Sequence, residues 1–176
     1  MFLTALSVAV AAEPAHPPAQ GSQAPDFSLK SSRGDEVRLS TLTGESRVVL
    51  VVLRGYPGYQ CPFCNRQVQD LVKNEAEFAK AGLKVVTVYP GPAADLGQRA
   101  NEFLQDKNFP AAYEMLLDPD YKFTNLYGLR WDAPKETAYP STFVLDKNRV
   151  IVFEKVSGQH GDRTTSAEIL EAAGKK

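Results

Sequence analysis

Two apolar runs, 47–54 (RVVLVVLR) and 83–89 (LKVVTVY), dominate the middle of the chain. Continuous β-branched runs of this length are typical of strands that are buried on both faces of a sheet. The segment between them begins at Cys61 and ends at Gly82, and it places Val68, Leu71, Val72 and Ala79 on one helical face. This strand–helix–strand order predicts a parallel βαβ unit.

Shorter alternating segments flank this unit. Residues 26–30 and 36–39 are predicted strands joined by a turn at 31–34, and 142–145 and 150–156 form a second predicted hairpin. Residues 95–98 have the spacing of a capping box, which predicts a helix from there to about Lys107. Residues 118–120 are a predicted turn, and a short helix is predicted at 121–127. Residues 165–168 are predicted to cap a last helix. The order predicts one α/β domain over residues 24–176, a mixed sheet flanked by helices with an N-terminal β-hairpin extension.

The amino end has a different composition from this domain. Residues 1–12 are uncharged and mostly apolar, with small residues at Ala9 and Ala11, and residues 13–23 form a Pro/Ala-rich leader. This pattern predicts a signal peptide and export, with no membrane span once the signal is removed. No Lys or Arg precedes Lys30, so the basic start of a signal is missing. The alternative is an apolar tail on a cytoplasmic protein.

Charge and composition exclude some classes of function. The chain has 20 basic and 21 acidic side chains, which leaves no positive field to attract the phosphates of a nucleic acid. Apolar residues make up 43% of its 176 positions, enough for one folded core. A folded domain without a nucleic-acid partner is therefore expected.

Cys61 and Cys64 are the only cysteines, and they stand where a buried strand leads into a helix. Free N–H groups and the helix dipole stabilise a thiolate in the first turn, and Pro62 suits the first helical position. Cys64 lies on the same helical face, within reach of a mixed disulfide on Cys61. We therefore predict that Cys61 is the attacking thiol and Cys64 the resolving thiol.

The pair has three other interpretations. A structural disulfide would close a very short loop and contribute little stability. A zinc site needs four ligands, and His160 is the only further donor near folded structure. The two thiols could also be inert parts of the core. The position at a helix start favours a redox-active pair, which needs neither a metal nor an organic cofactor.

The C-P-F-C motif at a strand-to-helix junction resembles the thioredoxin superfamily, over residues 21–173. The segments APDFSL, LSTLTG and LLDPDYKFTNLYGL are similar to the AhpC/TSA redoxins, which include peroxiredoxins and TlpA-like relatives. The resemblance implies a thioredoxin-like fold and a thiol-dependent oxidoreductase that reduces disulfides or hydroperoxides and is restored by an external dithiol such as thioredoxin. YPSTFVLD is similar to the strand that carries a cis-proline, which implies a cis Pro140 beside the cysteines, with backbone exposed for a substrate chain.

The chain departs from the peroxiredoxin pattern around the first cysteine. That pattern has Thr or Ser three residues before it and Pro seven before it, where this chain has Gly58 and Arg54. The arginine that polarises peroxide is replaced by the dipeptide at 140–141. The usual hydrogen-bond donors for peroxide are thus absent, and Arg54, Arg66 and Arg163 are the candidates to replace them.

A rival function also resembles a known family. Sco proteins bind copper through two cysteines and a distant histidine, and here Cys61, Cys64 and His160 would be the ligands. Sco cysteines, however, are separated by three residues, whereas only Pro62 and Phe63 lie between these two. Around the pair, Tyr56, Tyr59 and Phe63 would form either an apolar rim or simple loop packing, and Trp131 would lie nearby as a packing anchor or a recognition residue.

Overall fold

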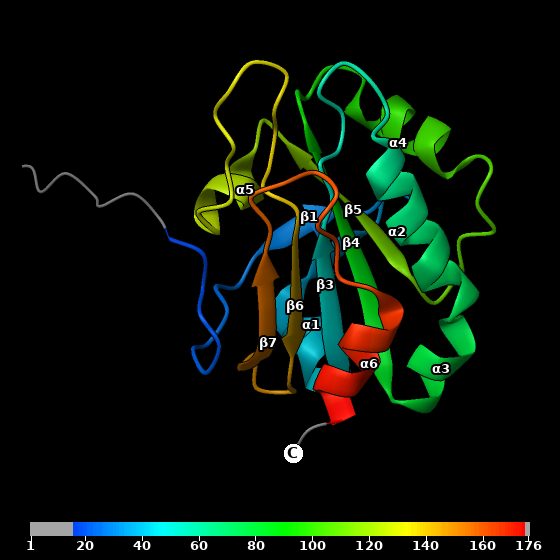
Figure 1. Cartoon of the computed structure of the whole chain (residues 1–176), viewed down its shortest axis with the longest axis vertical. Coiled ribbons are helices and arrows are strands. Elements are labelled where there is room, and N and C mark those ends of the chain that lie inside the picture. The colour runs from blue at the N-terminus through cyan, green and yellow to red at the C-terminus, as the bar shows by residue number, and fades with distance from the viewer. Residues whose placement is uncertain (1–15, 175–176) are drawn as a thin grey trace, which may run out of the picture.

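A computed structural model describes residues 16–174 and contains a central five-stranded sheet in the order β5-β4-β3-β6-β7 (Figure 1). Its strands are β3 (Arg47–Val52), β4 (Leu83–Gly91), β5 (Glu114–Pro119), β6 (Ser141–Leu145) and β7 (Ile151–Val156). β3 is parallel to β4, and β4 to β5, whereas β3–β6 and β6–β7 are antiparallel. The predicted mixed sheet, central β3 and βαβ unit are confirmed.

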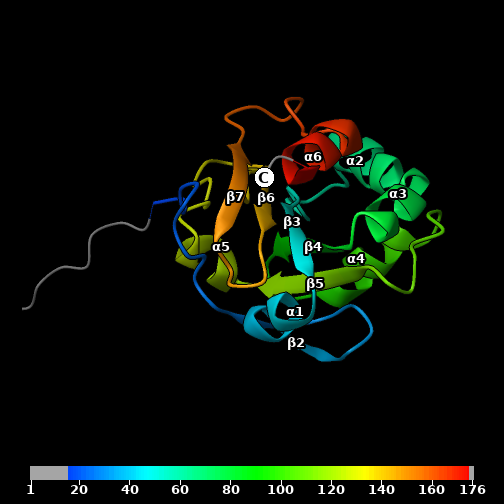
Figure 2. The ribbon, with the colours of Figure 1, turned by 90° about the horizontal axis from the view of Figure 1, so that it is seen from below.

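Strand alternation gives the sheet two apolar faces. Val48, Leu50 and Val52 of β3 belong to one core cluster, and Val49 and Val51 belong to the other. The first face is covered by the β1–β2 hairpin (Ser28–Lys30 and Glu36–Arg38), α1 (Leu39–Glu45) and α5 (Lys122–Leu126), and the second by α2 (Pro62–Lys73), α3 (Glu75–Lys80), α4 (Leu96–Leu104) and α6 (Ser166–Gly174) (Figure 2). Both cysteines belong to the second core, Cys61 at the N-cap of α2 and Cys64 in its first turn.

The long helix predicted between the two central strands is two helices. Asn74 separates α2 from α3 and has φ −102° and ψ 18°, outside helical geometry. Its side-chain amide donates to the carbonyl oxygen of Asp70 across 2.8 Å. Asparagine competes in this way with backbone hydrogen bonding, so the helix ends here and restarts at Glu75.

Other local predictions differ from the structure at the polar ends of elements. The capping box at 95–98 does not form, because Asp95 has φ 60° and makes no side-chain cap hydrogen bond. The turn predicted at 118–120 begins inside β5, a strand that the sequence analysis missed together with α1. The capping box before α6 does form: Thr165 and Glu168 exchange hydrogen bonds.

The predicted signal peptide, residues 1–12, and residues 13–15 of the predicted leader lie outside the described residues. Between residues 16 and 174, no helix combines the length and apolar character needed to span a bilayer. Export therefore stays a prediction from the sequence.

Candidate active site

The loop from β3 to α2 turns sharply against the end of β4. The Tyr56 N–H donates to the carbonyl oxygen of Pro90 across 2.9 Å. Gly55 has φ +66°, and a Cβ there would lie 1.9 Å from that same oxygen, so only glycine allows this approach. The loop delivers Cys61 to the N-cap of α2, with Pro62 at the first helical position as predicted.

Both cysteines are free thiols with almost no solvent exposure, 2% for Cys61 and 1% for Cys64. A hydrogen bond from the Cys64 thiol outweighs the effect of burial and, with helix N–H groups and the Arg163 charge, lowers the pKa of Cys61 to about 5. Burial raises the pKa of Cys64 well above that of an ordinary thiol. At neutral pH the site therefore holds a thiolate at Cys61 and a thiol at Cys64.

Arg163 brings positive charge to both sulfurs. Its Nη2 lies 3.5 Å from Sγ of Cys64 and 3.8 Å from Sγ of Cys61. The rest of the guanidinium is held from two sides: Nε donates to the carbonyl oxygen of His160 across 2.7 Å, and Nη1 lies 3.4 Å from Oε1 of Gln67. Of the three candidate arginines, Arg163 is therefore the one whose guanidinium lies at the cysteines.

Arg54 contacts the site through its backbone and forms an ion pair through its side chain. Its N–H donates to Sγ of Cys64 across 3.3 Å, while Nε donates to Oε2 of Glu136 across 2.7 Å. His160 Nε2 lies 3.0 Å from that same oxygen. Despite partial burial, which acts the other way, the hydrogen bonds from Arg54 and His160 lower the pKa of Glu136 and keep it ionised.

Glu136 is a site residue that the sequence analysis missed. It stands in a loop between α5 and β6, with no periodicity or motif around it. Arg54, its partner, is 82 residues away in the chain. The only available signal was Arg54 at the end of an apolar strand, because a buried arginine needs an anion.

Pro140 does not have the geometry that the family resemblance implied. No peptide bond among residues 16–174 is cis, so the prediction of a cis Pro140 is wrong. The neighbouring backbone is also occupied: the Tyr139 N–H donates to the carbonyl oxygen of Leu129, and the Pro140 carbonyl oxygen accepts from the Ser157 N–H, both across 2.9 Å. The Tyr139 carbonyl oxygen accepts from the Ser141 hydroxyl across 2.8 Å, so each of these backbone groups already has an internal partner. The bond between Pro140 and Ser157 continues the pairing of β6 with β7.

Gly58, which replaces the Thr or Ser of peroxiredoxins, has φ +97°. Side chains with a Cβ rarely adopt this conformation, so the loop excludes the hydroxyl residue of the family pattern. Tyr59 follows it and is 45% exposed. Its hydroxyl accepts a hydrogen bond from Arg54 Nη1, and the Arg54 guanidinium lies 4.8 Å from the centre of its ring. Tyr59 therefore anchors the loop to the Arg54 side chain through both its hydroxyl and its ring.

The three aromatic residues of the predicted rim, Tyr56, Tyr59 and Phe63, each pack on a different arginine, which favours simple loop packing. Phe63 packs between the guanidinium of Arg66, 4.6 Å from its ring centre, and the backbone at Gly161. Trp131 stacks on Tyr139 with ring centres 4.7 Å apart and lies 5.1 Å from the His160 ring. Both contacts are packing contacts that hold the 157–165 loop against the protein.

The three residues of the copper hypothesis are not brought together as ligands. The imidazole of His160 bonds to Glu136, and only the backbone oxygen of His160 contacts Arg163. Among residues 16–174, no group of three or more His, Cys, Asp or Glu side chains could hold a metal ion. The arrangement suits thiol chemistry rather than metal coordination.

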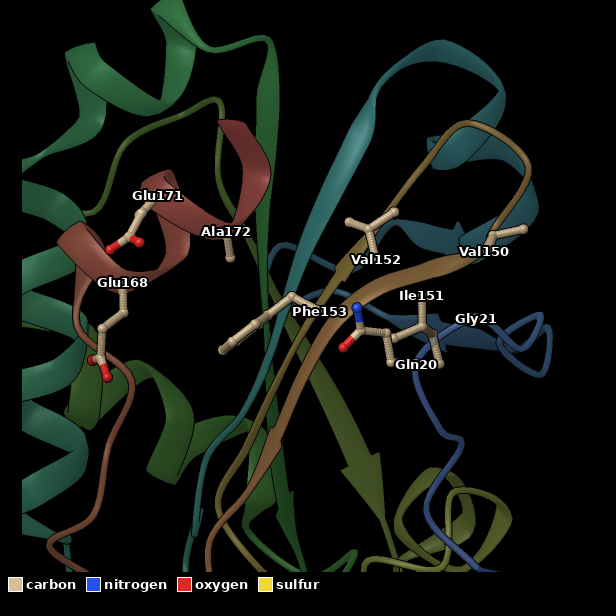
Figure 3. Close-up of a pocket in the computed structure, with 9 residues that line it drawn as sticks. All are labelled: Gln20, Gly21, Val150, Ile151, Val152, Phe153, Glu168, Glu171 and Ala172. Carbon is tan, nitrogen blue, oxygen red and sulfur yellow. The ribbon is translucent and has the colours of Figure 1, made fainter. Parts of the chain in front are cut away.

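A cavity of about 650 Å³ lies elsewhere, between β7, α6 and the segment at Gln20 (Figure 3). Phe153 points into it from the strand, and the carboxylates of Glu168 and Glu171 lie on the helix side. Neither cysteine lines it, nor does any arginine or histidine. This cavity therefore contains neither the cysteines nor the charged groups around them.

Comparisons with known proteins show which family the chain resembles. The family model of the AhpC/TSA family matches residues 20–154. Peroxiredoxin Q of rice chloroplasts (Oryza sativa subsp. japonica) is 30% identical over 134 residues, 76% of this chain and 57% of that protein, so the chain spans little more than half of this relative's length. Peroxiredoxin Bcp of Bacillus subtilis (strain 168) is 26% identical over 140 residues, 76% of this chain and 82% of that protein.

The fold is also that of solved structures. Peroxidoxin BcpB from Mycobacterium tuberculosis superimposes with a TM-score of 0.71 at 23% identity, over 89% of this chain and 94% of that chain. The predicted α/β thioredoxin-like fold with an N-terminal hairpin is confirmed. With its sheet, its cysteine-bearing helix start and a family match over most of its length, this chain belongs to the AhpC/TSA family.

Proposed function

We propose that this protein is a two-cysteine thiol peroxidase that reduces hydroperoxides at Cys61 and resolves the product with Cys64. The observation that carries the proposal is the opposite ionisation of the two buried sulfurs: the pKa of Cys61 is lowered to about 5, while that of Cys64 is raised. A thiolate beside a protonated thiol is the starting state that peroxide reduction by two cysteines requires.

The first step is an attack by the Cys61 thiolate on the terminal oxygen of a hydroperoxide. The S–O bond forms as the O–O bond breaks, and the sulfur is oxidised to a sulfenic acid that keeps the proton of the hydroperoxide. The other oxygen leaves as an alkoxide or hydroxide and takes a proton from water to become an alcohol or water. The Arg163 guanidinium, 3.8 Å from the attacking sulfur, stabilises the negative charge that moves onto the leaving oxygen.

The second step joins the two cysteines. Cys64 gives up its proton and attacks the Cys61 sulfur, and the hydroxyl group of the sulfenic acid leaves with that proton as water. The Cys61–Cys64 disulfide forms within one helical turn. An external dithiol of the thioredoxin type then exchanges with the disulfide, which returns both thiols and oxidises the dithiol.

Disulfide exchange with another protein is the second candidate, favoured by the C-P-F-C spacing. Two observations weigh against it. Cys61 is only 2% exposed, which admits a small molecule more easily than a peptide. The backbone groups at Tyr139 and Pro140, where a substrate strand was expected to bind, already have internal partners.

The deciding experiment uses Cys64→Ser, which stops the reaction after the first step. Exposed to one equivalent of hydrogen peroxide, this variant is expected to accumulate a sulfenic acid on Cys61, detected by dimedone labelling and mass spectrometry. Cys61→Ser is the control and should take up no label. A Cys64→Ser protein that instead traps a partner protein in a mixed disulfide, with no sulfenic acid, would establish disulfide exchange and overturn the peroxidase.

Titration of the reduced protein with Cu(I) distinguishes copper binding from peroxide reduction and from disulfide exchange. If the Sco-like function were correct, His160→Ala would weaken stoichiometric binding. We expect the same weak binding with and without the imidazole, because Glu136 holds His160 through Nε2. A stoichiometric site that His160→Ala abolishes would support the chaperone.

We further propose export, on the basis of the apolar residues 1–12. In an oxidising compartment, a protein with this cysteine pair depends on a dedicated dithiol reductant. Fractionation of bacteria that express the full chain, with the mass of the mature protein measured, tests the proposal. Recovery of the uncleaved chain in the cytoplasm alone would contradict it.

A further inference from the structure

The contacts around Arg163 close into a ring that begins and ends at Cys64. From Sγ of Cys64 the ring runs through the Arg54 N–H at 3.3 Å, and then from the Arg54 side chain to Glu136 at 2.7 Å. It continues through the His160 imidazole at 3.0 Å, the His160 carbonyl oxygen and Arg163, and returns to the sulfur at 3.5 Å. Every link between two residues of the ring is a hydrogen bond or an ion pair.

The ring joins three separate parts of the chain. Arg54 follows β3, Glu136 lies in the loop before β6, and His160 and Arg163 lie in the loop between β7 and α6. Glu136 is the central member, because one of its carboxylate oxygens, Oε2, meets both Arg54 Nε and His160 Nε2. Through that shared oxygen the β7–α6 loop is tied to the β3 end beside Cys64.

Burial makes this tie strong. Arg54 is 1% exposed, and the side chain of Glu136 is 13% exposed. In such surroundings charged hydrogen bonds are weakly screened, and their geometry is well defined. His160 is further confined by Trp131, whose ring centre is 5.1 Å from its own. The His160 carbonyl therefore has a fixed place from which to accept the Arg163 Nε–H.

We propose that Arg163 is a catalytic residue of this site, the cation for the Cys61 thiolate and the leaving oxygen, and that Glu136 and His160 are the residues that position it. The catalytic part rests on the proposed peroxidase function. The stabilisation of the Cys61 thiolate by Arg163 is independent of that function, because Arg163 contacts the sulfurs whatever the substrate is. Arg163 thus supplies, from the β7–α6 loop, the charge that the dipeptide at 140–141 lacks.

The first test measures Cys61 as a nucleophile, without peroxide. The rate of Cys61 alkylation by iodoacetamide is followed against pH in the Cys64→Ser background, in which the only remaining thiol is Cys61. Arg163→Ala should shift the profile to higher pH, and Arg163→Lys should shift it less, because lysine keeps the charge but loses the planar fork. Arg66→Ala, which removes an arginine stacked on Phe63, is the control and should leave the profile unchanged.

The second test measures peroxide reduction with both cysteines present. Arg163→Ala should lower kcat/KM for hydrogen peroxide about 100-fold, the usual effect of removing a donor to developing charge. His160→Ala, which keeps the Arg54–Glu136 pair and the 160 carbonyl, should lower it about tenfold by loosening Arg163. Circular dichroism and thermal melting confirm that each variant is folded.

The double variant His160→Ala/Arg163→Ala shows whether His160 acts by positioning Arg163 or has a role of its own. If His160 acts only through Arg163, adding His160→Ala to Arg163→Ala should change kcat/KM by less than about twofold. Effects that multiply would overturn the positioning role. An unchanged alkylation profile in folded Arg163→Ala would overturn the role of Arg163 at the thiolate. A shifted profile in a protein without peroxidase activity would uphold that role and refute only the proposed function.

Discussion

The backbone N–H of Arg54 donates a hydrogen bond to Sγ of Cys64 across 3.3 Å. One residue thus touches the resolving cysteine with its main chain while its guanidinium forms a buried ion pair with Glu136. Because the Arg54 carbonyl oxygen also accepts from the Thr137 hydroxyl, the end of β3 is fixed to the loop that leads into β6. The position of Cys64 therefore depends on a residue that takes no part in the chemistry.

Loss of this arginine should destabilise the fold. Arg54→Ala leaves the largely buried Glu136 carboxylate without its main partner and is expected to lower the free energy of unfolding by about 3 kcal/mol, measured by urea denaturation. Arg66→Ala, at an exposed arginine that packs on Phe63, should cost less than about 1 kcal/mol. Equal losses in the two variants would show that the Arg54–Glu136 pair has no special role.

Alkylation of the reduced protein should distinguish the two thiols by pH. With the pKa of Cys61 lowered to about 5, its thiolate persists from neutral pH down to about 5, and its reaction with iodoacetamide should fall only below that value. Cys64, with its pKa raised, should stay unmodified at neutral pH. Peptide mapping by mass spectrometry reads both sites. Preferential labelling of Cys64 would reverse the assigned roles.

The lowered pKa of Cys61 also makes the free energy of unfolding depend on pH. A thiol whose pKa is lower in the folded protein than in the unfolded chain stabilises the fold at high pH, and this contribution fades as the pH falls toward the folded value. Unfolding of wild type and Cys61→Ser, compared between pH 8 and pH 5, should therefore show a difference that shrinks with acidification. A constant difference would mean that the thiolate contributes nothing to folding.

Restoring the hydroxyl residue of the peroxiredoxin pattern should not improve the protein. Gly58→Thr places a β-branched side chain at φ +97° and is expected to cost about 1–3 kcal/mol of stability. Gly44→Ala is the matched control, because Gly44 lies in α1 with open space around it, and alanine there should stabilise by about 0.5–1 kcal/mol. A gain of peroxidase activity in folded Gly58→Thr would contradict this view of the loop.

Pro140 should be dispensable for peroxide reduction. Its bond is trans, and its carbonyl oxygen is held by the Ser157 N–H, so Pro140→Ala keeps the hydrogen bonding and is expected to change kcat/KM by less than about threefold. Steady-state turnover with hydrogen peroxide and a dithiol measures this. A loss comparable to that of Cys61→Ser would restore the proline to the active site.

Several features followed from the sequence because their causes are local. The β-branched run at 47–54 became β3 at the centre of the sheet, since apolar residues on both faces require burial on both faces. Cys61 took the N-cap of α2, where Pro62 and the free N–H groups of a helix start determine the geometry. The hairpin strands and the capping box at Thr165 were predicted for similar reasons.

Two local cues at the polar ends of elements failed. Asp95 and Gln98 have the spacing of a capping box, yet Asp95 adopts φ 60° and makes no cap. The predicted turn at 118–120 begins inside an edge strand, because residues 118 and 119 pair with Pro90 and Gly91 of β4. The buried carboxylate of Asp118 meanwhile accepts hydrogen bonds from two backbone N–H groups at the start of α5. Propensity is a weak guide at positions where a polar group has a buried partner.

By itself, the sequence determined a single α/β domain and a reactive cysteine pair at a helix start, because strand patterning and helix-end electrostatics act over a few residues. Only the tertiary structure decided which side chains surround that pair. Arg163 is 99 residues from Cys64 and Glu136 is 82 from Arg54, and both lie in loops. Their meeting depends on how the whole sheet packs, and no local pattern encodes such a long-range contact.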